Sequence, residues 1–208
     1  MICSRAVRKQ AAWRVLAVAT LVAAAACSSG KPKATPSATV PTAPAQTTTT
    51  DPLAVPDAID AAYVNRVLAG LDAVVGDMAR VVVQSKTIAP EAISRLRALY
   101  KTDSRLQLEI DILQEEARHG FSDYRSAPGN QKTEVKKLIT QRATCIFAQV
   151  TRDYSAVVTT PAAPQNQWVI LVPIDRSRDP LNYNRTSWMY AYDGFQSDGS
   201  EPANLCTA

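Results

Sequence analysis

The chain has 208 residues, of which 46% are hydrophobic and 20% are charged, and its formal net charge is +4. Four of the 23 basic residues precede Cys27 and none of the 19 acidic residues does, so the rest of the chain carries equal numbers of each sign. This balance excludes the basic surface that is typical of nucleic-acid binding, and it excludes an acidic tail. We therefore expect no nucleic-acid partner.

Residues 1–26 have the layout of a secretory signal peptide. Basic residues come first, an apolar run begins at Val15, and Leu-Val-Ala-Ala-Ala-Ala stands directly before Cys27. The apolar run is shorter than the roughly 20 residues that a permanent membrane span needs. A cysteine directly after small residues indicates a bacterial lipobox. We predict that Cys27 carries acyl chains such as palmitate and anchors the protein to the outer face of the cytoplasmic membrane.

An ordinary cleavage site is the alternative. Lipoboxes usually have leucine three positions before the cysteine, and this chain has Ala24 there. The residues 24–26, all alanine, also fit a small-x-small cleavage site. Under that alternative the protein is freely secreted and Cys27 is a thiol. The polar stretch that follows favours lipidation, because it suits a tether.

Residues 27–55 are predicted to be the lipidated cysteine and a disordered tether. The stretch contains five prolines and the run of four threonines at 47–50, and few of its side chains are suited to a core. At about 3.1 Å per residue, a polyproline-like chain of this length would hold a domain up to roughly 80 Å from its anchor. The globular domain is then expected to occupy residues 56–208.

The first half of this domain has the 3.6-residue period of helices. Pro56 and Asp57 predict the start of the first helix, with Asp57 as its N-cap. Gly70 and Gly76 lower its helix propensity, so we expect them to permit close packing. The apolar stripe of this helix consists of Ile59, Tyr63, Val67, Leu71, Val74, Met78 and Val81.

A second helical stretch begins near Pro90, a residue suited to a first helical turn. The Thr-Asp-Ser sequence at 102–104 is expected to divide it into two helices, with a cap at Thr102 or Asp103. Gly120 is a natural C-cap, and residues 121–130 are predicted to form a loop.

From Lys132 onward the period becomes two, which predicts strands. They are expected near 132–139, 145–150, 168–172 and 187–192. Strict alternation would place Trp188, Tyr190 and Tyr192 on one face of the last strand. These aromatic side chains either pack in the core or form a pocket or aromatic surface for a partner. Helices followed by strands predict an α+β fold, with N-terminal helices packed on a mostly antiparallel C-terminal sheet.

Two cysteines, Cys145 and Cys206, remain after Cys3 and Cys27 are assigned to the signal peptide and the anchor. In an exported domain they predict one disulfide. Closing a loop of about 60 residues would stabilise the domain by roughly 4 kcal/mol. Two unpaired thiols are the alternative. Metal ligation is disfavoured because His119 is the only histidine.

Three segments carry a resemblance to a family. They are Thr-Cys-Ile-Phe at 144–147, Arg-Asp-Tyr-Ser at 152–155, and the ending Ser-Trp-Met-Tyr-Ala-Tyr-Asp-Gly-Phe at 187–195 before Cys206. Together they resemble a set of actinobacterial lipoproteins and exported proteins whose domain is similar to nuclear transport factor 2. The resemblance implies a cone-shaped α+β fold over residues 59–206, and it supports the disulfide. It transfers no catalytic residue.

Few residues of this chain are suited to catalysis. His119 stands at a predicted helix end, where a histidine usually interacts with the last carbonyl groups. A pocket enzyme of this fold would pair a carboxylate base with a tyrosine, as in ketosteroid isomerases. The residues available for such a pair are Asp153 with Tyr154, Asp123 with Tyr124, and Tyr190 and Tyr192.

We therefore predict a non-catalytic domain without cofactor or metal. It would bind an envelope protein partner or an apolar ligand while the lipid at Cys27 holds it at the membrane. A small isomerase-like or dehydratase-like pocket enzyme of the same fold is the alternative. The Asn-Arg-Thr sequence at 184–186 matches a glycosylation sequon, to which we give little weight.

Overall fold

Three helices precede a four-stranded sheet in the computed structural model, which describes residues 54–194, 200–204 and 206. The described residues belong to one unit, 50–208. The predicted mixed α+β class, with helices first and an antiparallel sheet second, is confirmed. The elements are α2 (Ala61–Ser85), α3 (Pro90–Leu99), α4 (Asp103–Arg118), β1 (Lys132–Arg142), β2 (Cys145–Asp153), β3 (Gln165–Pro173), the short 3₁₀ helix η2 (Arg176–Arg178) and β4 (Trp188–Gly194).

Helix α2 begins later than the sequence predicts. Its N-cap is Asp60, whose side chain accepts a 2.7 Å hydrogen bond from the Tyr63 backbone N–H, so Asp57 is not the cap. Both glycines of α2 permit close approaches, as expected. A Cβ at Gly70 would lie 2.5 Å from Thr186 Cγ2, and one at Gly76 would lie 2.9 Å from the Gly129 carbonyl oxygen.

Helices α3 and α4 follow the predicted boundaries. Pro90 is the first residue of α3. Thr102 caps α4, because its side chain accepts from the Arg105 backbone N–H. The C-cap of α4 is His119, one residue before the predicted Gly120. Gly120 follows it with a φ of +63°, a conformation that glycine adopts without strain.

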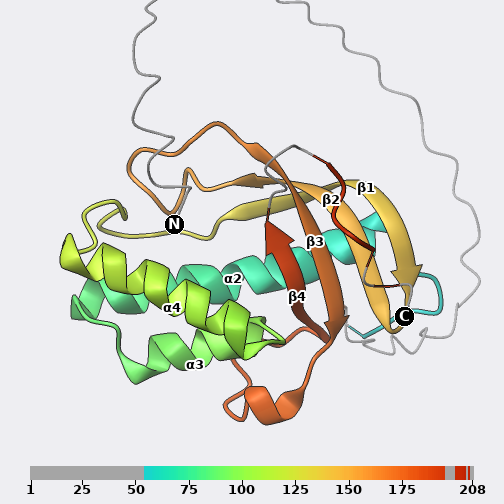
Figure 1. The fold of residues 1–208 in the computed structure, drawn as a ribbon, viewed down its shortest axis with the longest axis horizontal. Helices are drawn as coiled ribbons and strands as arrows, with labels where there is room; N and C mark the ends of the chain where they lie inside the picture. The colour runs from blue at the N-terminus through green and yellow to red at the C-terminus, as the bar shows by residue number, and fades with distance from the viewer. Residues whose placement is uncertain (1–53, 195–199, 205, 207–208) are drawn as a thin grey trace, which may run out of the picture. The chain divides into compact units, whose positions relative to one another are not determined.

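The sheet is an antiparallel meander in the order β1-β2-β3-β4. Figure 1 shows α2 running behind the sheet, with β4 and β3 in front of it. Two irregularities interrupt the β1–β2 register, and a third lies where the β3–β4 register shifts between Ile170 and Leu171. At the third, Leu171 pairs with Tyr190 and Ile170 with Tyr192, so Ala191 is an extra residue.

Each face of the sheet carries a buried apolar cluster. The face toward the helices contributes Ile146, Ala148, Val150, Val169 and Leu171 to the main core, together with the apolar face of α2. The opposite face carries a smaller cluster that includes Phe147, Trp168, Ile170 and the two cysteines.

Both edge strands of the sheet, β1 and β4, are partly paired. On β1, the Thr133 N–H donates to Asp72 Oδ2 over 2.7 Å and the Val135 N–H donates to Asn65 Oδ1 over 2.8 Å. Both acceptors are side chains of α2. On β4, the Tyr190 carbonyl accepts from the Lys101 N–H over 2.9 Å.

Candidate functional site

The aromatic residues of β4 do not share one face. Trp188 and Tyr190 are buried among the helices, whereas Tyr192 packs against the cluster on the opposite face. The prediction that all three lie on one face is wrong, because Ala191 is a bulge and inverts the alternation after it. Trp188 and Tyr190 therefore pack in the core and do not form an aromatic surface.

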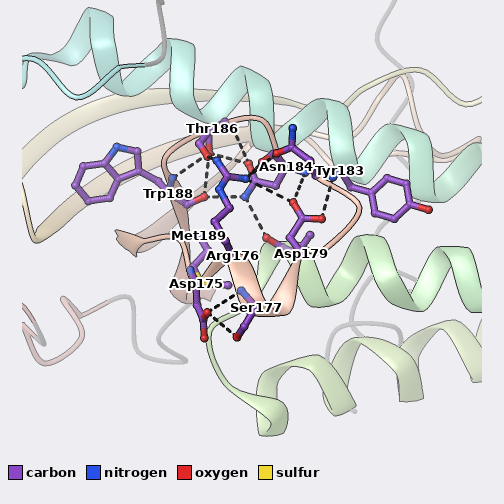
Figure 2. A network of polar contacts seen from close by, with 11 residues as sticks. Asp175, Arg176, Ser177, Asp179, Tyr183, Asn184, Thr186, Trp188 and Met189 are labelled. Atoms are coloured by element: carbon purple, nitrogen blue, oxygen red, sulfur yellow. Dashed lines mark hydrogen bonds and ion pairs between the residues drawn. The ribbon is translucent and has the colours of Figure 1, made fainter.

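Trp188 is fixed by a buried network in the loop before β4. Its indole Nε1–H donates to the Tyr63 hydroxyl over 2.8 Å. Asn184 donates from Nδ2 to the Ala98 and Trp188 carbonyls, and Asp179 accepts the Asn184 backbone N–H. Figure 2 shows Asp179, Asn184 and Thr186 converging inside this loop. Asn184 is fully buried with its amide nitrogen bonded, so the sequon is not accessible in the folded domain.

A charged network lies between the helices and the sheet. Arg152 of β2 is 4% exposed and donates to Asp193 Oδ2 over 3.1 Å, to Thr133 Oγ1 over 3.2 Å and to the Tyr190 hydroxyl over 3.4 Å. Asp193 is also buried, and its Oδ1 lies 2.9 Å from Arg105 Nη2 of α4. This arrangement fills the interior with paired charges and hydrogen bonds, which is how proteins accommodate buried ions.

The network continues to the surface of α4. Arg105 forms a second ion pair with Glu109, 2.6 Å away. Burial raises the pKa of Glu109, although the Arg105 guanidinium acts in the opposite direction. Burial also raises the pKa of the Tyr190 phenol, so this hydroxyl stays protonated at neutral pH.

Asp72 stands at the other end of the network. It is 3% exposed, and its carboxylate accepts from Gln131 Nε2, Thr133 Oγ1 and the Thr133 N–H, over 2.8, 2.8 and 2.7 Å. Burial raises its pKa above the ordinary 3.8, while these hydrogen bonds lower it. Thr133 Oγ1 donates to Asp72 and accepts from Arg152, so it links the carboxylate to the charged network.

Asp72 also lines an open groove of about 300 Å³ between α2 and the start of β1. This groove, called the α2–β1 groove below, is the larger of two described hollows. The other, about 40 Å³, lies between α3 and the loop after η2. The residues that line the α2–β1 groove are Asn65, Ala69, Asp72, Asn130, Gln131, Lys132, Thr133 and Glu134.

The acid–tyrosine pairs weighed from the sequence do not form sites. Asp153 is half-buried and accepts from the Ser155 N–H, whereas the Tyr154 hydroxyl accepts from Gln167 on β3. Asp123 is exposed in the loop after α4, and Tyr124 packs edge-on against Phe121.

His119 is exposed at the end of α4, and its Nε2 lies 3.4 Å from Glu115 Oε1. Apart from this exposed glutamate, no described carboxylate or hydroxyl group is paired with His119 in the way that a catalytic triad requires. Within the same residues, no group of three or more metal-ligating side chains is placed to hold an ion.

The two remaining cysteines lie on the opposite face of the sheet. Cys145 and Cys206 are bonded, with their Cα atoms 5.5 Å apart, and both are buried. The bond attaches the C-terminal segment to the start of β2, and Arg142 donates to the Cys206 carbonyl beside it. Phe147 and Trp168 pack in the same cluster.

Cys27 and the tether lie outside the described residues. Within the part of the chain that is described, no helix combines the length and apolar character that crossing a membrane requires.

Sequence reasoning missed the charged network, although two of its members had a signal. Asp72 stands four residues after the buried Leu68, inside the apolar face of α2. Arg152 lies two residues after Val150 on β2, so its side chain points to the same inward face as those of Ala148 and Val150. Asp193 had no such signal, because the bulge at Ala191 reverses its direction.

Comparison of the chain with protein-family models, with curated proteins and with solved structures gives no match.

Proposed function

We propose that the chain is a cell-envelope lipoprotein whose domain of residues 56–208 is a non-catalytic binding or scaffolding module. Lipid at Cys27 would hold it on the outer face of the cytoplasmic membrane, and residues 28–55 would serve as the tether. The finer fold that we propose is the cone of nuclear transport factor 2-like proteins, with α2 against the concave face of the sheet.

One observation carries the non-catalytic assignment. In that fold the reactive pocket lies between helices and sheet. Here buried Arg152, Asp193 and Tyr190 occupy this space, and Arg152 donates to both of the others. A substrate would have to displace a buried ion pair, and removing one partner from such a pair costs about 3–5 kcal/mol. A binding role that uses the outer surface avoids this cost.

The anchor is tested by intact-mass analysis of the protein extracted from its own cells. We expect a mature N-terminus at Cys27 with a mass increase equal to the attached acyl chains, and recovery in the detergent phase. Cys27→Ala should abolish both, while Cys3→Ala, which changes only the segment removed with the signal, should leave both intact. Recovery of unmodified wild-type protein from the aqueous phase would contradict the anchor.

A small pocket enzyme remains the second candidate because Asp72, a buried acid with a raised pKa, lines the α2–β1 groove. No tyrosine is among the described residues that line it, so the acid lacks the phenol that an isomerase of this kind uses. Proton–deuterium exchange next to the carbonyl of small ketones tests this role. Exchange that is lost in Asp72→Asn would favour the enzyme, and its absence in the wild type favours the binding module.

A further inference from the structure

Small residues of α2 shape the α2–β1 groove. Ala69 is exposed on α2 and contributes only a methyl group to the groove. Gly76 lets the turn at Gly129 lie against the helix, because any side chain there would overlap this turn. Arg80 holds the same turn through the Pro128 carbonyl, 3.0 Å away.

The polar side chains of the groove are held in fixed orientations. Asn65 Oδ1 accepts from the Val135 N–H, and Asn130 Oδ1 accepts from Arg80 over 3.4 and 3.3 Å. Gln131 Nε2 donates to Asp72 over 2.8 Å. Each amide therefore has one end committed to the fold, which fixes the direction of the other end.

The uncommitted ends offer both kinds of hydrogen bond. Among the described residues, no partner is bonded to Nδ2 of Asn65, to Nδ2 of Asn130 or to Oε1 of Gln131. Two donors and one acceptor thus remain beside the Asp72 carboxylate. At the rim, Lys132 and Glu134 neutralise one another over 2.7 Å.

This chemistry selects the class of ligand. An apolar ligand would leave the amide groups without partners, which is costly. An anion would meet the Asp72 carboxylate, and the cation at the rim already has a partner. An added peptide strand would need the edge N–H groups of Thr133 and Val135, which α2 already occupies. A hydroxyl both donates and accepts, so neighbouring hydroxyls match the free groups.

We infer that the α2–β1 groove binds a neutral polyhydroxylated ligand, of the carbohydrate class, through Asn65, Asn130 and Gln131. The volume of about 300 Å³ is at the lower end of the range for small-molecule sites. For its setting this inference rests on the proposed function, because a domain outside the cytoplasmic membrane would meet cell-wall glycans. The free oligosaccharide and the wall polymer share the same chemistry.

The experiment is a titration of the ¹⁵N-labelled full chain followed by nuclear magnetic resonance. The protein is kept in a detergent without a sugar headgroup, since a glycoside detergent would compete. The probes are neutral tetrasaccharides of glucose, mannose, arabinose and N-acetylglucosamine, and tetra-alanine represents peptides. We expect saturable shifts of the Asn65, Asn130 and Gln131 side-chain amide signals with at least one saccharide.

Three variants and a matched control make the result specific. Asn65→Asp and Asn130→Asp keep the acceptor that the fold uses and remove the donor, so each should weaken binding about fivefold, the value of roughly one hydrogen bond. Ala69→Leu should block the groove with little loss of helix propensity. Ala62→Leu, at an exposed position of α2 outside the groove, should bind as the wild type does.

Cosedimentation with insoluble cell-wall polymer then distinguishes a polymer ligand from a free oligosaccharide, and Ala69→Leu should abolish it. The inference is overturned if no saccharide shifts these signals at its highest soluble concentration, if Ala69→Leu binds normally, or if tetra-alanine binds in place of the saccharides. A lipid-free chain that binds saccharides would overturn the anchor and keep this inference. A lipidated chain that binds no saccharide would support the anchor and overturn this inference.

Discussion

Replacing Asp193 by asparagine should be the most informative test of the buried charges. The change preserves the shape of the side chain and removes its charge, so Arg152, which is 4% exposed, loses the carboxylate at 3.1 Å. Removing one partner of a buried pair costs about 3–5 kcal/mol. Arg152 keeps its bonds to Thr133 and Tyr190, so we expect the lower end, about 3 kcal/mol.

At about 2–4 °C per kcal/mol for a chain of this size, the melting temperature should fall by roughly 6–12 °C. Urea unfolding followed by tryptophan fluorescence gives the free energy, with an unchanged m-value showing that the same surface is exposed. Asp123→Asn, an exposed carboxylate, is the matched control and should change stability by less than about 0.5 kcal/mol.

A double-mutant cycle separates the ion pair from other effects. Arg152→Met alone should leave Asp193 with only Arg105, and combining it with Asp193→Asn should cost at least about 1 kcal/mol less than the two single losses together. Additive losses, or a loss below about 1 kcal/mol for Asp193→Asn, would refute the reasoning that this carboxylate neutralises a buried guanidinium.

Three further predictions concern other parts of the domain. Gly76→Ala should destabilise by about 1–3 kcal/mol in urea unfolding, despite its better helix propensity, because the new Cβ overlaps Asn130; a stabilised variant would contradict the contact. For Asp72, the native pKa lies above the unfolded 3.8, so the native state binds the proton more tightly and stability falls as pH rises from about 3.8 to the native pKa. Asp72→Asn should remove this part of the slope in urea midpoints measured across acid pH, and an identical slope would exclude Asp72 as its source. Cys206→Ser should lower the free energy of unfolding by roughly 4 kcal/mol under non-reducing conditions, for a loop that spans a sequence separation of 61; a reducing agent should then have no further effect on the variant.

The order of elements could be predicted from the sequence because local periodicity determines it. The stripe of α2 and the division at Thr102 are short-range patterns, and both are observed. The start of α2 was less predictable. Asp57 and Asp60 both suit an N-cap by residue type; the structure uses Asp60, and Ile59 packs in the core directly before it.

The interior of the site could not be predicted because it depends on register. One inserted residue, Ala191, turns Tyr192 outward and Asp193 inward, and no local pattern in the sequence marks the bulge. The α2–β1 groove was missed for a similar reason. It joins α2 to a turn more than fifty residues away through a contact at Gly76 that only the tertiary fold specifies.

The occupied sheet edges have a consequence for copies held at high density. An edge strand with unpaired backbone groups is a template to which strands of neighbouring molecules can add, which leads to fibres. Here side chains of α2 bond to the first half of β1, and two bulges and the lysines at 136–137 disrupt the rest. The backbone before α4 pairs with β4 at Tyr190. Proteins crowded on one surface, as the proposed anchor would make them, could therefore collide repeatedly without polymerising side by side.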